Sequence, residues 1–239
     1  MRASDLSEYK TLKTAKTKLG NEIRLVGNSD FPSNMPVSLV IGVFHGDEPQ
    51  GKFLIEEYLK RQSTLSPTSK SGGKKTNNLL FIPCLNPDGM QLGQRTNANG
   101  VDLNRNFPTK NWGENLGDNA TCDDEKSAYY GGISAGSEIE TKFLINIIQE
   151  FNPKTILTLH APYKVVNYDG PAKELAEKIS TIINYPVEAS IGYPTPGSFG
   201  TYAGVERQIS TITLELDEIC PVQDLIKPVH EIFDELWNY

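Results

Sequence analysis

Short apolar runs alternate along the chain with segments whose apolar residues recur every three or four positions. Residues 37–44 and 79–84 are two such runs, rich in leucine, isoleucine and valine, which is typical of strands buried on both faces of a parallel sheet. Between them, Phe53, Leu54 and Tyr58 fall at helical spacing, and residues 63–78 are too polar for a core. The first part of the chain therefore predicts strand, helix, polar loop and strand.

The same alternation continues toward the C-terminus. Apolar runs predict strands over residues 156–159 and 211–216, and apolar stripes predict helices over residues 137–151, 175–183 and 225–237. The letters SEIE at the start of the first stripe predict a capping box. Strands that alternate with helices predict an α/β fold, with a mostly parallel mixed sheet and helices on both faces. With no internal repeat, the length favours one domain over residues 1–239.

Composition narrows the kind of partner. The net charge is −7, with 23 Lys and Arg scattered among 30 Asp and Glu, whereas a nucleic-acid surface needs a basic face. The 3 cysteines have no CxxC spacing, so neither a disulfide framework nor a thiolate zinc site is predicted. No segment has the apolar core of a signal peptide or of a membrane span. We expect a soluble cytoplasmic protein with a small-molecule or peptide substrate and neither nucleic acid nor membrane as a partner.

The stretch VFHGDEPQG places His45 at the end of a predicted strand and Glu48 three residues later. A hydrolytic zinc site takes three ligands from histidine and carboxylate and leaves a fourth position open. Gly46 would permit the sharp turn that brings both side chains to one ion, although a surface turn explains the pair as well. His160, at the end of another predicted strand, is the best-placed third ligand. His230 lies in the last predicted helix, where we expect a structural role.

Two other features could complete such a site. Glu215 interrupts an apolar strand in ITLELDE, an unfavourable position for a carboxylate unless it lies at the strand end or in a polar site. It is the leading candidate for a general base. Residues 95–107, RTNANGVDLNRNF, supply two arginines and four asparagines, and arginine can bind a carboxylate or an oxyanion. A solvated loop is the alternative, and residues 86–136 as a whole form either a functional loop region or an insertion.

Six motifs of this sequence resemble, in order and spacing, the zinc metallocarboxypeptidases of the M14 type. The motifs are HGDE at 45–48, NPDG at 86–89, RTNANGVDLNRNFP at 95–108, LHAP at 159–162, TPGSFGTYAG at 195–204 and TLEL at 213–216. The resemblance extends from about residue 20 to the C-terminus and is strongest to short bacterial members that act on murein peptides. It implies a carboxypeptidase fold and a zinc-dependent peptidase.

The resemblance also implies a role for each matching residue. One zinc ion would be held by His45, Glu48 and His160, with Glu215 as general base and acid. Further roles would be oxyanion stabilisation by Arg95, binding of the substrate's terminal carboxylate by Asn104 and Arg105, and substrate contact by a mobile tyrosine, either Tyr193 or Tyr202.

The implied reaction is hydrolysis of the amide bond before a C-terminal amino acid, as in γ-D-glutamyl-meso-diaminopimelate released during cell-wall turnover. Asp169, Asp217 and Glu218 are candidates for a pocket that takes the side chain, and each also fits a plain surface acid. Aspartoacylases and succinylglutamate desuccinylases are an alternative with a similar zinc core, and a zinc-bound peptide-binding protein without activity is another. The TPGSFGTYAG and TLEL motifs favour the peptidase. The short relatives also make a homodimer an option.

Overall fold

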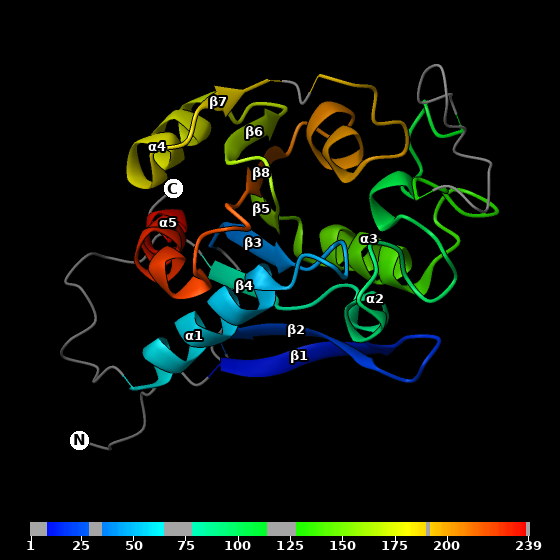
Figure 1. The fold of residues 1–239 in the computed structure, drawn as a ribbon, viewed down its shortest axis with the longest axis horizontal. Coiled ribbons are helices and arrows are strands. Elements are labelled where there is room, and N and C mark those ends of the chain that lie inside the picture. The colour runs from blue at the N-terminus through cyan, green and yellow to red at the C-terminus, as the bar shows by residue number, and fades with distance from the viewer. Residues whose placement is uncertain (1–8, 29–34, 65–77, 114–127, 190–191, 238–239) are drawn as a thin grey trace.

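A computed structural model describes residues 9–28, 35–64, 78–113, 128–189 and 192–237. Through this part of the chain runs an eight-stranded sheet in the order β1-β2-β4-β3-β5-β8-β6-β7 (Figure 1). The strands are β1 (Tyr9–Lys16), β2 (Glu22–Asn28), β3 (Val37–Gly42), β4 (Asn78–Ile82), β5 (Thr155–His160), β6 (Val165–Asp169), β7 (Val187–Glu188) and β8 (Ser210–Glu215). Of the predicted polar loop over residues 63–78, residues 65–77 lie outside the described part, as do residues 114–127 of the long segment 86–136.

The centre of the sheet is parallel. Strands β4, β3, β5 and β8 pair in parallel, and β3, β4 and β5 are buried along their whole length. Antiparallel strands flank this centre, with β2 beside β4 and β6 beside β8. The four central strands are the four that the sequence predicts, so the mostly parallel mixed sheet is confirmed. The flanking strands were not predicted, because they are short or half-exposed and lack a continuous apolar run.

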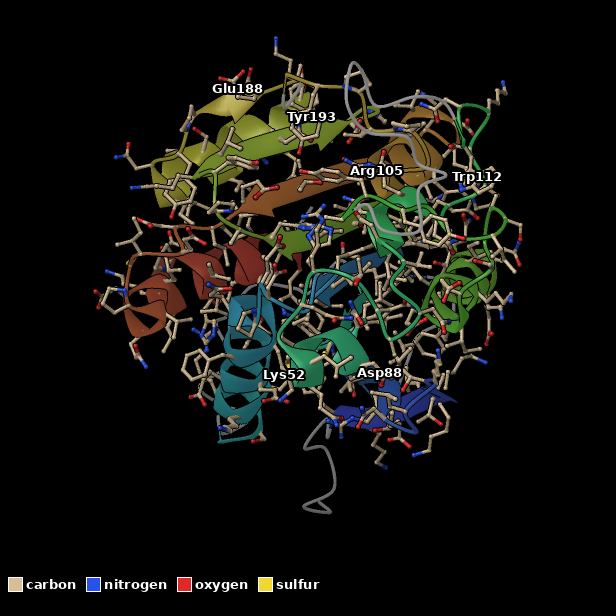
Figure 2. All side chains as sticks on the ribbon, turned by 45° about the vertical axis from the view of Figure 1, so that its right-hand side comes forward. Lys52, Asp88, Arg105, Trp112, Glu188 and Tyr193 are labelled. Atoms are coloured by element: carbon tan, nitrogen blue, oxygen red, sulfur yellow. The ribbon has the colours of Figure 1, made fainter. Side chains whose placement is uncertain are left out.

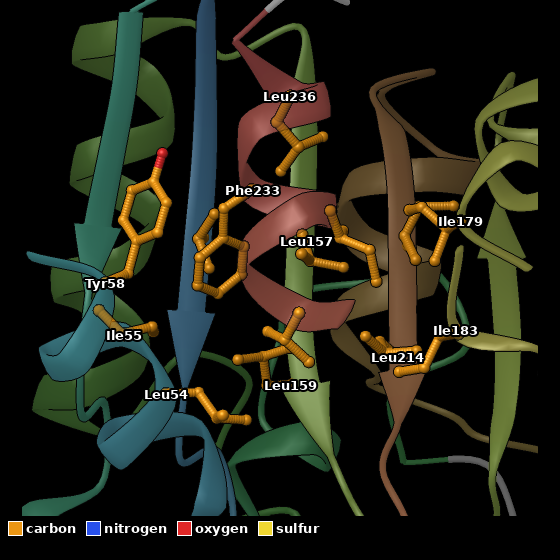
Figure 3. Close-up of a cluster of buried hydrophobic side chains, with 14 of the residues drawn as sticks. Leu54, Ile55, Tyr58, Leu157, Leu159, Ile179, Ile183, Leu214, Phe233 and Leu236 are labelled. Atoms are coloured by element: carbon orange, nitrogen blue, oxygen red, sulfur yellow. The ribbon is translucent and has the colours of Figure 1, made fainter. Parts of the chain in front are cut away.

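Helices cover both faces of the sheet, as predicted (Figure 1). One core joins α1, α4 and α5 to the sheet through side chains such as Leu54, Ile179 and Phe233 (Figure 3). A second core lies on the opposite face, under α3 and η2. The helical elements are α1 (Gln50–Thr64), α2 (Pro87–Leu92), η1 (Leu103–Arg105), α3 (Ile139–Phe151), α4 (Lys173–Ile183), η2 (Thr201–Val205), η3 (Val222–Leu225) and α5 (Ile226–Leu236). None of the described helices is long and apolar enough to cross a membrane.

The predicted capping box at the start of α3 is wrong. Glu138 occupies the N-cap position and no side chain caps the helix there. Ser137 instead donates from Oγ to Glu138 Oε1 at 2.6 Å and accepts a hydrogen bond from Asn106 Nδ2 at 3.0 Å. Glu140, which would have completed the box, is buried and accepts from Asn97 Nδ2 at 3.3 Å. Contacts to the 95–107 loop therefore replace the local cap.

The carboxyl ends of β3, β5 and β8 meet at one edge of the sheet, because the three strands run in parallel. His160, the last residue of β5, is paired in register with Glu215, the last residue of β8. His45 follows β3 three residues after its end. This edge therefore gathers the predicted chemical groups, and ligands of parallel sheets bind at such edges.

Candidate metal and substrate site

Two histidines and a glutamate lie close enough together to hold one metal ion. His45 Nδ1 is 2.7 Å from Glu48 Oε1, and His160 Nδ1 is 3.0 Å from Glu48 Oε2. One ligand atom from each of the three residues lies within 4.8 Å of the other two. All three are at most slightly exposed, and the two histidine rings contact each other with centroids 4.9 Å apart. The structure thus brings together the three predicted ligands.

The turn that carries His45 and Glu48 is built differently from the sequence-based expectation. Val43, not Gly46, has the left-handed backbone conformation, with φ of 55°. Gly46 is required for another reason, since a Cβ atom there would overlap the backbone of Gly89. Its N–H also donates to the carbonyl oxygen of Arg95 at 3.2 Å. Gly46 therefore allows close approach between the metal-ligand turn and α2, which contains Gly89.

Asp102 is a residue that the sequence reasoning missed. It is completely buried, and its Oδ1 lies 3.2 Å from His45 Nε2 while its Oδ2 accepts from Arg95 Nε and Nη2 at 3.0 Å each. Burial by itself raises the pKa of Asp102, but Arg95 and His45 outweigh it and hold the pKa far below its usual range. A carboxylate behind a metal-binding histidine fixes which ring nitrogen faces the metal. The acid inside the VDLNR motif was the available signal.

The electrostatics of the cluster suit a cation. Burial lowers the pKa of His45, but the carboxylates of Glu48 and Asp102 raise it to about 9 overall. Burial likewise raises the pKa of Glu48, yet the two histidines hold it below its usual range. Two histidine nitrogens that each hydrogen-bond to one oxygen of Glu48, with Asp102 behind His45, match the donor set of a zinc site. The residues present therefore fit zinc.

Glu215 lies beside this cluster with an unused oxygen. Its side chain is 7% exposed, and Oε2 is buried without a hydrogen-bond partner among the described residues. Burial is the main cause that raises the pKa of Glu215, with nearby Glu48 adding to it and His160 opposing it. A buried carboxylate with one free oxygen next to a metal site has the geometry of a general base.

Arg95, Asn104, Arg105 and Tyr193 line one cavity of about 320 Å³ with the metal ligands and Glu215. Arg95 and Arg105 stand over the ring of Tyr129, with guanidinium carbons 5.3 and 5.6 Å from its centroid. Asn104 is fixed through Oδ1, which accepts from the backbone N–H of Phe199 at 2.8 Å. Asn104 and Arg105 thus share the cavity wall.

The two candidate tyrosines occupy different places. Tyr193 is 40% exposed and lines the cavity, and Figure 2 shows it above Arg105, beside the β6 and β7 edge of the sheet. Tyr202 is 1% exposed, packs against Phe107 in the second core and does not line the cavity. Of the two candidates, Tyr193 is therefore the one that lines the cavity, together with Tyr129 and Tyr163.

His230 lies far from this cluster, in α5. It is buried, and its Nε2 is 3.0 Å from the backbone carbonyl oxygen of Leu54. Its ring packs against Tyr58 and Phe233. These contacts are those of a core residue, in line with the structural role expected from its position.

Together, the sheet and the His, Glu, His cluster at its carboxyl edge define a metal-dependent hydrolase of the α/β class. The chain belongs to the zinc carboxypeptidase family, whose model matches residues 2–181. The matched residues include the three candidate metal ligands and the arginine loop. Glu215 and Tyr193 lie beyond them.

Individual relatives agree with the family. Murein peptide amidase A of Escherichia coli strain K12 is 35% identical over 184 residues, which cover 76% of this chain and 71% of that protein. Murein peptide amidase A of Vibrio campbellii is 40% identical over 144 residues, covering 58% of this chain and 56% of that protein.

Solved structures extend the likeness to the whole chain. The murein-tripeptide amidase from Escherichia coli O157 superposes with a TM-score of 0.73 at 27% identity, covering 100% of this chain and 97% of that one. Carboxypeptidase A from Helicoverpa armigera gives a TM-score of 0.74 at 20% identity over 96% of this chain and 66% of its own. The second likeness concerns the fold alone.

Proposed function

We propose that this protein is a zinc carboxypeptidase that releases the C-terminal amino acid from murein peptides. The bond cleaved is the amide bond between γ-D-glutamate and meso-diaminopimelate. The observation that carries the proposal is the position of Glu215. Glu215, whose buried Oε2 has no hydrogen-bond partner among the described residues, lines the same cavity as the His45, Glu48 and His160 cluster and the two arginines. The substrate is inferred from relatives named as murein peptide and murein-tripeptide amidases.

In this proposal, His45, Glu48 and His160 hold one zinc ion, whose charge when bound lowers the pKa of water from about 15.7 toward 7 and polarises a carbonyl group. The Glu215 carboxylate takes the proton of the attacking water. The raised pKa of Glu215 helps the next step, because the protonated carboxyl can donate that proton to the leaving amine nitrogen. The bond to the C-terminal residue then breaks, and Glu215 is again a carboxylate because the proton it took from water has gone to the leaving amine.

The arginine loop binds and orients the substrate. Arg95 is held by two hydrogen bonds to Asp102, so its remaining N–H groups are oriented before substrate arrives and can stabilise the oxygen that develops negative charge. Asn104 and Arg105 bind the terminal carboxylate, for which a guanidinium group is well suited. This carboxylate contact restricts cleavage to the last residue of a peptide.

Glu215→Gln tests the assignment of the base. We expect the variant to bind zinc normally and to lose turnover by about 10²- to 10⁴-fold, since glutamine cannot accept the proton. Mass spectrometry of diaminopimelate released from L-Ala-γ-D-Glu-meso-diaminopimelate measures the turnover, and metal analysis measures zinc.

Glu188→Gln is the matched control, because Glu188 is exposed at the sheet edge and loses the same charge. Undiminished turnover by Glu215→Gln would refute the base assignment. A zinc-loaded wild-type protein that cleaves N-acyl amino acids and not the peptide would support the deacylase alternative instead.

Three further expectations stay predictions. They are a cytoplasmic location, a homodimer, and a single catalytic domain over residues 1–239. Cell fractionation and light scattering of the purified protein measure the first two, and limited proteolysis measures the third.

A further inference from the structure

Tyr129 is a cavity residue that lies outside the six sequence motifs and has no role in the site so far. Its side chain is 37% exposed and lines the same cavity as the metal ligands. The guanidinium carbons of Arg95 and Arg105 lie 5.3 and 5.6 Å from the centroid of its ring. One partly exposed ring therefore contacts both arginines that are proposed to bind the substrate.

The backbone next to Tyr129 is fastened to the arginine loop. The carbonyl oxygen of Tyr130, which is buried, accepts from the backbone N–H of Asp102 at 2.8 Å. The following carbonyl oxygen, that of Gly131, accepts from Asn106 Nδ2 at 2.8 Å. Because these hydrogen bonds hold the segment against the loop, the place of the Tyr129 ring over the guanidinium groups is set by the backbone.

Arg105 depends on this ring more than Arg95 does. The described carboxylates that form ion pairs with arginines of this loop, Glu48 and Asp102, both do so with Arg95. Arg105 is 1% exposed; its Nη1 donates to a backbone carbonyl oxygen at 2.7 Å, and its Nε is buried without a hydrogen-bond partner among the described residues. A buried charge with so few partners is unfavourable. The negative face of an aromatic ring stabilises such a cation.

We propose that Tyr129 is a positioning residue whose ring holds the guanidinium groups of Arg95 and Arg105 at a fixed distance from each other. In the proposed function, one arginine binds the terminal carboxylate and the other binds the oxygen of the scissile carbonyl. These two groups are a fixed number of bonds apart at the end of a peptide. A ring shared by the two arginines therefore sets the register of the substrate before it binds.

The inference rests on the proposed carboxypeptidase function and adds a residue to its substrate-binding part. The variants Tyr129→Leu and Tyr129→Phe test it. Since a contact between a cation and an aromatic face contributes about 2- to 30-fold in binding, we expect Tyr129→Leu to lower kcat/KM on L-Ala-γ-D-Glu-meso-diaminopimelate by about 5- to 30-fold. KM should rise and kcat should fall, because both arginines lose the contact. Tyr129→Phe keeps the ring and should stay within about threefold of the wild type.

Labelling with phenylglyoxal, which modifies guanidinium groups, gives a measurement that needs neither activity nor zinc. Removing the ring should expose Arg105, so its rate of labelling should rise several-fold in Tyr129→Leu and stay unchanged in Tyr129→Phe. Peptide mapping by mass spectrometry measures this rate. Ile133→Ala is the control, because Ile133 lies near Tyr129 in the chain, is 84% exposed and does not line the cavity. It should match the wild type in both measurements.

Two results would overturn the role of the ring and leave the proposed function intact. One is a kcat/KM of Tyr129→Leu within about twofold of the wild type, or unchanged labelling of Arg105 in that variant. The other is an equal loss of activity in Tyr129→Phe and Tyr129→Leu, because the hydroxyl group and not the ring would then be responsible. No cleavage of the peptide by the zinc-loaded wild type would overturn the proposed function and the substrate-positioning role with it.

Discussion

At the scale of single residues, Asp102 joins two parts of the candidate site. One of its oxygens faces His45 and the other holds Arg95, while its Oδ1 also accepts from the backbone N–H of Asn104 at 2.8 Å. The metal ligand, the proposed oxyanion-binding group and the proposed carboxylate-binding loop therefore share one buried charge. Moving this one side chain would misplace all three.

Asp102→Asn should weaken zinc binding about 10- to 100-fold, because an amide orients the histidine ring less firmly than a carboxylate. Even at saturating zinc, the kcat/KM of the variant should stay below that of the wild type, since Arg95 loses its ion pair. Zinc titration with a competing chelator and kinetics at saturating zinc separate the two effects. Asp224→Asn, a change at an exposed acid of η3, is the control, and a full recovery of kcat/KM at high zinc would argue against the link to Arg95.

The residues of this site could be predicted from the sequence where a short motif or the end of an apolar run marks them. His45 and Glu48 stand in one short motif, and His160 and Glu215 each end an apolar run. Asp102 could not be assigned in this way, because its role depends on the approach of His45 from 57 positions away. Gly46 was singled out for the wrong reason, since contact with Gly89 is a tertiary feature.

At the scale of elements, the start of α3 is a buried acidic junction. Asn97 Nδ2 donates to Glu138 Oε2 at 2.8 Å and to Glu140 Oε2 at 3.3 Å, which ties the helix to the arginine loop. Burial, with added repulsion from Glu138 and Asp88, raises the pKa of Glu140 to about 7, against an opposing hydrogen bond from Asn97. The folded chain thus holds a proton at Glu140 more tightly than the unfolded chain does.

This shift predicts a pH dependence of stability. Between the unfolded pKa, about 4.5, and the folded pKa, about 7, the unfolded state releases the proton first, so the free energy of unfolding falls as pH rises, by on the order of 3 kcal/mol in total. Glu140→Gln should remove this part of the decline. Urea unfolding at pH 5 to 8 and fixed zinc saturation measures it, with Glu174→Gln, an exposed acid in the first turn of α4, as control. Parallel curves for wild type and Glu140→Gln would contradict the prediction.

The sequence predicts the strands that are buried on both faces and the helices that have one apolar face. β3, β4, β5 and β8 carry continuous apolar runs, and α1, α4 and α5 carry regular stripes. β1 and β2 form an antiparallel hairpin with a shift in register between Thr11 and Lys13, and β7 has two residues. Such segments carry little periodic signal of their own and are defined by their partners in the sheet.

At the scale of the whole molecule, the proposed zinc ligands come from two separate parts of the chain. His45 and Glu48 follow β3, and His160 ends β5. A metal that binds only when these strands are assembled stabilises the folded state by an amount that grows with the logarithm of its concentration over Kd, about 4 kcal/mol at a thousandfold excess.

Removing zinc with a chelator should therefore lower Tm by roughly 10 °C, given about 2 to 4 °C per kcal/mol for a chain of this size. His160→Ala should show no such difference between chelated and zinc-loaded samples. Glu215→Gln should keep it, because that residue is not a proposed ligand. Differential scanning calorimetry of the three proteins, each chelated and zinc-loaded, measures the effect, and an equal Tm of the wild type with and without zinc would contradict metal binding by this cluster.

The pairing of His160 with Glu215 on neighbouring strands determines which part of the site is disturbed first when the native structure fluctuates. Their backbones are joined in the central parallel ladder, and the N–H of Leu216 continues it to the carbonyl oxygen of His160 at 2.8 Å. Local opening of a surface loop cannot separate these two residues, whereas it can displace Tyr193. Thermal fluctuations of the native state therefore disturb substrate capture long before they disturb the alignment of base and metal ligand, which is lost only when the sheet itself comes apart.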